Sequence, residues 1–192
     1  YLDTGAMYRA CALKAMKEGL KHIDEKSVRP LMDSLDLRIE YRDGKQHTIL
    51  DGEDVSEAIR RPEVSMAASD ISALRCVREK MVEMQRKIAA EQSCVLDGRD
   101  IGSFVLPQAE FKFFITARSD VRARRRYDEL KAKGFDVDLA NLQKEIEQRD
   151  ENDSRREFAP LRRAEDAVLV DTSGMTIDEV LSFIEKKIQE KV

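Results

Sequence analysis

The spacing of apolar residues near the start of the chain predicts the end of a strand followed by a helix. Residues 1–3 have the pattern of a strand's last residues. Met7, Cys11 and Met16, with alanines between them, then fit one helix face that ends at Gly19, a residue type typical of helix C-termini. A second, shorter helical pattern lies around residues 31–35.

The period of the pattern then changes to two, which predicts a β-hairpin. Leu37, Ile39 and Tyr41 alternate with polar residues, and apolar residues return at 48–50. Asp43-Gly44 between them is a two-residue turn sequence. We interpret the hairpin as an insertion in a chain that otherwise alternates helices and strands.

The remainder of the chain has the order of an α/β domain. Residues 62–90 are helical with a break near Leu74, and their predicted buried stripe is Val77, Met81, Met84 and Ile88. Short apolar runs at 94–96, 111–115 and 167–170 predict buried parallel strands. Helices are expected at 119–133 and 139–153, and a last one begins at Thr176 with Glu179 in a capping box. We expect one domain over residues 1–192.

Composition narrows the function classes. The net charge of −4 argues against a nucleic-acid binder, and no apolar run is long enough to span a membrane. The three cysteines lack metal-ligand spacing and are expected to be free thiols in a reducing cytoplasm.

Two predicted strand exits carry the candidate chemistry. One strand leaves into Asp3-Thr4-Gly5, and another leaves into the run 97–102. In that run, glycines allow close approach of a ligand and Arg99 suits a phosphate. Asp97 and Asp100 could accept hydrogen bonds from a sugar or an amine, or hold Mg²⁺ through water. The alternative is a solvated turn with a local Arg–Asp pair.

Arginines form a third cluster. Five of them fall between residues 118 and 126 against one acidic residue, Asp120. Spacings of four and three put Arg149, Asp153 and Arg156 on one helix face, which suits the grip of one nucleotide. Without a nucleophile–base pair, these residues favour phosphoryl transfer or phosphate binding over hydrolysis. A solvated, paired helix face is the alternative.

These runs resemble bacterial cytidylate kinases. The resemblance rests on segments that follow one another in the family's order along the whole chain: Leu2 to Arg9, Gly52 to Ser56 with Ile59-Arg60, Val77-Arg78, Asp97 to Gly102, Arg149-Asp150 with Asp153 and Arg156, and Ala159 to Leu161. It implies a P-loop nucleoside monophosphate kinase fold: a parallel sheet flanked by helices, a monophosphate-binding insert at 37–76 and a helical lid at 122–156.

The resemblance also implies an activity and a set of site residues. The γ-phosphoryl group of ATP would pass to CMP or dCMP, giving CDP or dCDP, with Mg²⁺ carried by ATP and no direct protein ligand. Such an enzyme is expected to be cytoplasmic and monomeric. The carried-over residues are Ser69, Arg78 and Asp100 at the cytosine edge; Arg9, Arg99 and Arg156 on the phosphate; Arg149 and Asp153 at the sugar; Thr4 and Asp97 near the acceptor nucleotide; and Arg122, Arg126, Arg149 and Arg156 as catalytic arginines.

The chain departs from the family pattern in one respect. It contains no G-x-x-x-x-G-K-[ST] phosphate loop, which in the family connects a central first strand to the first helix. We expect that this strand is absent, that sequence upstream of Tyr1 or a fusion partner is missing, and that the chain alone is inactive. The alternatives are a P-loop kinase for another small phosphate acceptor, or a non-catalytic nucleotide-binding or assembly module.

Overall fold

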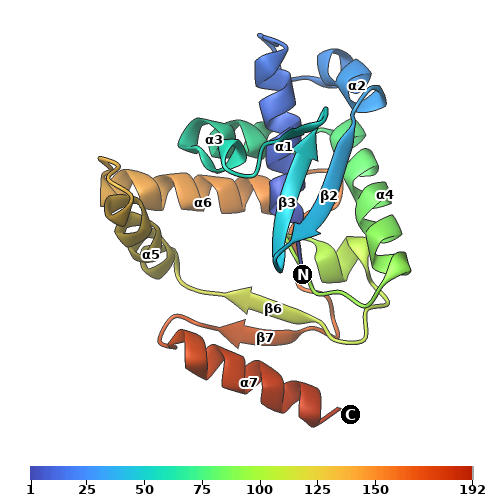
Figure 1. Ribbon diagram of the computed structural model, residues 1–192. Helices are drawn as coiled ribbons and strands as arrows, with labels where there is room; N and C mark the ends of the chain where they lie inside the picture. The colour runs from blue at the N-terminus through green and yellow to red at the C-terminus, as the bar shows by residue number, and fades with distance from the viewer. Residues whose placement is uncertain (192) are drawn as a thin grey trace. The chain divides into compact units, whose positions relative to one another are not determined.

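The chain folds into two compact units (Figure 1). The computed structural model describes residues 1–191, and the units comprise Tyr1–Ile101 and Gly102–Val192. The elements belong to the α/β class. The expected single domain, with its insert and lid, stays a prediction, and each unit is described by itself below.

The first unit is organised around a short parallel strand pair and the helix that follows it. β1 (Leu2–Asp3) pairs in parallel with β5 (Leu96–Asp97), with Asp3 opposite Asp97. α1 (Thr4–Lys17) begins directly after β1, and Gly19 behind it has the left-handed φ of +67° expected at a helix end. The helix predicted after Asp3 is therefore confirmed.

Three further helices complete the first unit. α2 (Glu25–Asp33) contacts α4 (Arg75–Glu91), while α3 (Pro62–Ile71) and the 3₁₀ turn η1 (Ala58–Arg60) contact α1. The predicted break near Leu74 is confirmed, because Leu74 lies between α3 and α4 with an extended conformation. The buried face of α4 differs from the predicted stripe, since it also holds two polar side chains, Arg78 and Gln85.

The predicted hairpin is present. β2 (Leu37–Arg42) pairs with β3 (Lys45–Leu50), and the turn residues Asp43 and Gly44 both have positive φ, as a type I′ turn requires. A second turn of this kind at Asp51-Gly52 leads into β4 (Glu53–Asp54). The pattern missed β4 because two acidic residues carry no hydrophobic alternation.

The second unit contains the other parallel pair and three helices. β6 (Phe113–Thr116) pairs in parallel with β7 (Val168–Asp171) in register from Phe113 with Val168. The elements around them are α5 (Ser119–Ala132), α6 (Leu139–Arg155) and α7 (Ile177–Gln189), and the π-helical turn η2 (Ile101–Val105) spans the division between the units. The predicted strands and helices are confirmed as elements, although β5, β6 and β7 end one residue later than their apolar runs. Their predicted burial is wrong, since Ile115 is 55% exposed and Leu169 is 48% exposed.

The last helix shows what its sequence pattern could and could not predict. Thr176 and Glu179 form the expected capping box. Its apolar stripe, in contrast, is not buried: Ile177 is 80% exposed and Leu181 is 52% exposed. Across residues 1–191, no helix combines the length and the apolar character that a membrane crossing requires.

Candidate functional site

In the first unit, the two predicted strand exits lie side by side. Asp3 and Asp97 are neighbours in the β1–β5 register, and the Thr4 hydroxyl donates a hydrogen bond to the Asp97 carbonyl at 2.6 Å. This bond joins the start of α1 to the run 97–102. Ligands in parallel sheets bind beyond the carboxyl ends of the strands, so the pairing places Thr4 and Asp97 where a ligand is expected.

Gly98 allows this close approach. A Cβ atom there would lie 2.9 Å from Ile101 Cδ1 and closer still to the Thr4 hydroxyl. Any side chain at position 98 would therefore force the two strand exits apart.

Carboxylates and arginines lie close together around these two strand exits. Asp3 Oδ1 accepts from the Ala6 amide at 3.0 Å, which caps α1, and Asp3 Oδ2 pairs with Arg60 at 2.8 Å. Packing around the Asp97 carboxyl and the charge of Asp3 raise its pKa, while Arg9 and Arg60 act in the opposite direction. Asp97 is thus a carboxylate whose ionisation responds to nearby charge.

A buried ion pair lies behind the exits. Arg78 Nη2 on α4 bonds Asp100 Oδ2, and the two side chains are 1% and 5% exposed. Arg78 Nη1 also donates to the Ser72 carbonyl at 3.3 Å, and its Cζ lies over the Tyr8 ring, 5.4 Å from the centroid. Arg78 Nε is buried and has no hydrogen-bond partner in residues 1–191.

This pair bears on the two interpretations of the run 97–102. Asp100 bonds an arginine 22 residues away in the sequence and its side chain is buried, which a solvated turn would not produce. Because burying charged groups is costly in free energy, a buried ion pair beside a strand exit is a candidate for a binding or catalytic role.

The remaining predicted residues of the first unit are half-buried. Ser69 lies on α3 and its carbonyl accepts from the Ser72 hydroxyl at 2.9 Å. Arg9 lies on α1 and Arg99 follows Gly98 in the run 97–102.

In the second unit, two predicted arginines converge on one carboxylate near the end of α6. Arg156 Nη1 lies 3.3 Å from Asp153 Oδ1, and Arg149 Nε lies 4.0 Å from Asp153 Oδ2. Arg156 Nε also donates to the Ala159 carbonyl at 2.6 Å. The side chains of Asp153 and Arg156 are 7% and 6% exposed. The three side chains meet as predicted, but not on one helix face, because Arg156 follows the end of α6 with an extended backbone (ψ 141°).

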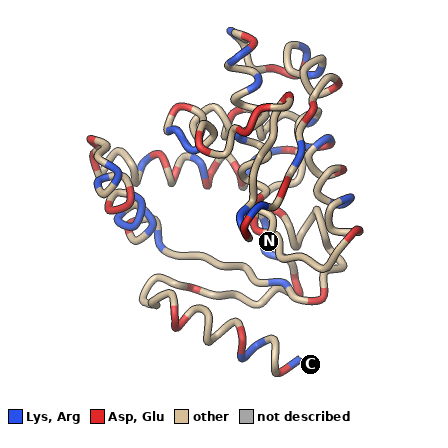
Figure 2. Tube along the Cα trace, viewed as in Figure 1, with Lys and Arg blue, Asp and Glu red and all other residues tan. Residues whose placement is uncertain are grey.

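Two arginines of α5, Arg122 and Arg126, are paired with carboxylates, whereas Arg125 donates to the Thr172 carbonyl at 2.7 Å. Figure 2 shows the basic residues gathered on this helix. Arg122 Nη2 lies 2.6 Å from Asp150 Oδ2, and Arg126 Nη1 lies 2.8 Å from Glu129 Oε2. The alternative of a paired helix face therefore describes the structure as it stands, and a phosphate would have to replace or join these carboxylates.

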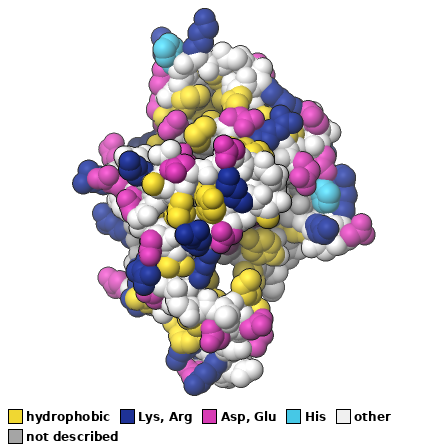
Figure 3. All heavy atoms as spheres, turned by 90° about the vertical axis from the view of Figure 1, so that its left-hand side faces the viewer, with side chains coloured by type: hydrophobic (Ala, Val, Ile, Leu, Met, Phe, Trp, Pro, Cys, Tyr) yellow, Lys and Arg dark blue, Asp and Glu magenta, His cyan; other side chains and the backbone are white. Residues whose placement is uncertain are grey.

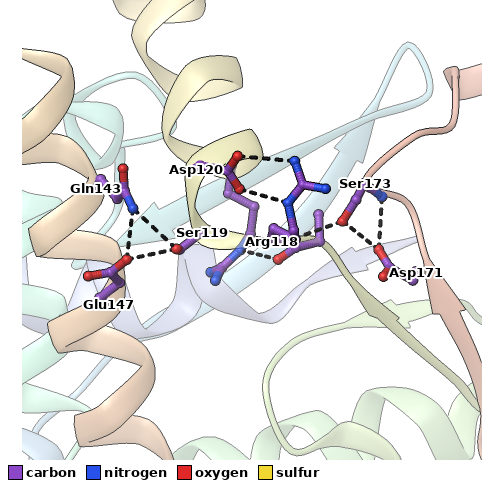
Figure 4. A network of polar contacts seen from close by, with 9 residues as sticks. Arg118, Ser119, Asp120, Gln143, Glu147, Asp171 and Ser173 are labelled. Atoms are coloured by element: carbon purple, nitrogen blue, oxygen red, sulfur yellow. Dashed lines mark hydrogen bonds and ion pairs between the residues drawn. The ribbon is translucent and has the colours of Figure 1, made fainter.

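A polar network fixes the start of α5 against α6 (Figure 4). The Ser119 hydroxyl donates to Glu147 Oε1 at 2.7 Å, and the Gln143 amide donates to the same oxygen at 2.9 Å. The Arg118 amide donates to the Ser173 hydroxyl at 2.9 Å, which ties the helix start to the end of β7. These bonds position the helix that carries Arg122 and Arg126.

Four residues that contact the strand exits or the Arg78–Asp100 pair were not predicted from the sequence as parts of the site. Asp3 was visible as a strand exit, and Tyr8 and Arg60 lie in motifs that were recognised, but no role was assigned to them. Gln46 on β3 gave no signal, although its amide accepts from the Asp3 amide at 2.8 Å and donates to the Asp3 carbonyl at 3.3 Å.

The described residues 1–191 show no dedicated metal site, and the face in Figure 3 carries charges of both signs. Among residues 1–191, no group of three or more His, Cys, Asp or Glu side chains could hold a metal ion. On the face shown in Figure 3, basic and acidic side chains are intermixed, in keeping with the net charge of −4.

Comparison with known proteins gives one consistent family. The "Cytidylate kinase" family profile matches residues 1–190. A cytidylate kinase of Caldicellulosiruptor bescii is 52% identical over 96% of this chain and 81% of its own length. Those of Syntrophotalea carbinolica and Halalkalibacterium halodurans are 50% and 45% identical, over 99% and 100% of this chain and 81% and 86% of their own lengths. The chain therefore belongs to the cytidylate kinase family.

Proposed function

We propose that the protein transfers the γ-phosphoryl group of ATP to CMP or dCMP, with the Arg78–Asp100 pair as its base reader. Family membership supports the reaction, and the burial of this ion pair is the observation that carries the choice of base. CDP or dCDP and ADP are the products.

The chemistry of the pair fits cytosine. A carboxylate offers about four acceptor positions, so Asp100 can accept from the cytosine amino group as well as from Arg78. Arg78 Nε, the buried donor without a partner among residues 1–191, can donate to the ring nitrogen or carbonyl. Uracil would turn a carbonyl toward Asp100, and two acceptors facing each other away from water are costly. Ser69 is the third residue assigned to this edge.

Further charged side chains are assigned to the rest of the nucleotide. Arg9, Arg99 and Arg156 would hold the CMP phosphate, and Arg149 with Asp153 would meet the sugar. Thr4 would lie near the acceptor nucleotide. The close pairing of Asp153 with Arg156 supports this assignment, since a preset carboxylate and guanidinium lose little freedom on binding.

Phosphoryl transfer itself needs positioning and neutralised charge. The acceptor phosphate oxygen forms the new P–O bond as the bond to the leaving ADP breaks. Arg122, Arg126, Arg149 and Arg156 are assigned to the charge of the transferring group. Arg122 and Arg126 would exchange Asp150 and Glu129 for phosphate oxygens as the proposed lid, residues 122–156, closes over the phosphates.

Magnesium would arrive with the nucleotide. Asp100 is buried, whereas Asp97 is exposed, so Asp97 is the carboxylate of the run 97–102 that could meet the water shell of the ion. Mg²⁺ bound to ATP supplies charge neutralisation on the phosphates.

The test is a transfer assay on the natural full-length protein with Mg-ATP and CMP, dCMP, UMP or AMP. We expect CDP and dCDP with equimolar ADP, and a value of kcat/KM for CMP at least about 100-fold above that for UMP. Arg78→Met should remove most of that preference. Equal use of UMP by the unaltered protein would refute the assignment.

A further inference from the structure

Tyr8 contacts Arg78 through its ring face. The guanidinium carbon lies 5.4 Å from the ring centroid, within the distance of about 6 Å at which an aromatic face attracts a cation. Because Arg78 is only 1% exposed, water does not weaken this attraction.

The sequence places the ring there through helix periodicity. Tyr8 follows Thr4 by four residues on α1, so both lie on the same face of the helix. Thr4 donates to the Asp97 carbonyl, so this face is directed toward the run that also carries Asp100.

Three different contacts then fix the guanidinium. Asp100 bonds Nη2, the Ser72 carbonyl accepts from Nη1, and the Tyr8 ring covers a face. The two hydrogen bonds act at the guanidinium nitrogens, whereas the ring opposes tilting of the group. The orientation of the remaining Nε donor depends on that tilt.

We propose that Tyr8 is a positioning residue that sets base selectivity by holding the Arg78 guanidinium against its ring. The inference rests on the proposed function, in which Arg78 and Asp100 read the cytosine edge. An aliphatic side chain fills part of the volume but lacks the electron-rich face. The Arg78 guanidinium can then turn, and water can reach Asp100. A uracil carbonyl then faces a less rigid Asp100 carboxylate, so uracil is rejected less strongly.

The experiment compares dissociation constants for CMP and UMP by titration calorimetry on the natural full-length protein. Tyr8→Leu should lower the UMP-to-CMP ratio of dissociation constants by about tenfold. Tyr8→Phe, which keeps the ring, should hold the ratio within about twofold of its original value. If Tyr8 had a purely structural role, Tyr8→Leu would weaken the binding of CMP and UMP equally and leave the ratio of dissociation constants unchanged.

Two further variants make the result unambiguous. Tyr41→Leu is the matched control, because Tyr41 belongs to the same unit but its hydroxyl donates to the Tyr1 carbonyl at 2.8 Å; its ratio should not change. If Tyr8→Leu does not fold, Tyr8→Met replaces it with a longer aliphatic side chain. A folded aliphatic variant that keeps the full ratio overturns the proposal.

Arg78→Met separates this inference from the proposed function. If Arg78→Met abolishes the preference for CMP while Tyr8→Leu preserves it, only the role of Tyr8 is wrong. If Arg78→Met preserves the preference, the base-reading assignment is wrong and the role of Tyr8 is overturned with it.

Discussion

Arg78 and Asp100 form a buried ion pair whose contribution to stability can be separated from the base recognition that we propose for it. Both side chains are buried, and each compensates the charge of the other. A buried charge without a partner is costly in free energy, so neither residue can be removed alone without consequence. The pair is held in place before any ligand is bound.

Removal of one partner tests this interdependence. Asp100→Leu should lower the free energy of unfolding by about 3 kcal/mol, because it leaves the Arg78 guanidinium buried and uncompensated. Arg78→Met combined with Asp100→Leu should recover most of that loss, since an apolar pair replaces the ion pair. Urea unfolding of the two variants measures both values, and equal losses would contradict the account.

Gly98 gives a second prediction at this scale. Gly98→Ala should destabilise the protein by about 2 kcal/mol, because the added Cβ meets Thr4 and Ile101. Gly174→Ala is the control, since nothing lies within 4 Å of a Cβ atom there. Thermal melting that shows no difference between the two variants would contradict the close approach.

Among single residues, the location of those at strand exits was easier to predict from the sequence than the location of the residues that contact them. Asp97, Asp100 and Thr4 follow predicted strands directly, so their meeting follows from parallel pairing alone. Arg60 and Gln46 contact Asp3 from elements whose placement depends on tertiary packing, which a local pattern does not encode.

At the scale of elements, the hairpin is attached to the strand that leads into the site. Gln46 on β3 bonds both the amide and the carbonyl of Asp3, and Lys14 of α1 pairs with Asp51 at 2.6 Å. The hairpin thereby supports the backbone from which Thr4 projects. Its existence was predictable from alternation and from Asp43-Gly44, but its attachment was not.

Loss of that attachment should be measurable. Gln46→Leu should cost about 1–2 kcal/mol of unfolding free energy, because the partly buried Asp3 amide loses its acceptor. Gln148→Leu on the exposed face of α6 should cost almost nothing. Comparable urea midpoints for the two variants would count against the attachment.

The β3–β4 turn region should give the protein part of its acid sensitivity. Hydrogen bonds from Ser56 and His47 hold the pKa of Asp54 well below its usual 3.8. A lowered pKa means that the stabilisation is complete above pH 3.8 and is lost as the pH falls through the lowered value.

Asp54→Asn isolates this contribution. The variant should be less stable than the unaltered protein at pH 6, and the difference should shrink as the pH falls below about 4. Thermal melts between pH 2.5 and 6 follow it. A difference that is constant across this range would exclude the Asp54 carboxylate as the source.

At the scale of the whole molecule, the residues that the proposed function assigns to the nucleotide are distributed over both units of the chain. Arg78 and Asp100 belong to the first unit, whereas Arg149, Asp153 and Arg156 belong to the second. Family membership and the order of the motifs were predictable from the sequence. The division at residue 101 was not, because no Pro- or Gly-rich linker marks it.

CMP binding should be visible at the proposed base-reading pair. Hydrogen exchange with saturating CMP should slow in α4, which carries Arg78, while the exposed helix α7 exchanges as before. Unchanged exchange in α4 would contradict the proposed role of Arg78.

The most direct test of the central claim is the binding of CMP and UMP to the unaltered protein and to Asp100→Ala, measured by titration calorimetry. The account predicts that the unaltered protein binds CMP at least about 100-fold more tightly than UMP. It also predicts that Asp100→Ala reduces this preference to less than about tenfold. A folded Asp100→Ala protein that still prefers CMP by the original factor would contradict the assignment of the buried pair as the reader of the base.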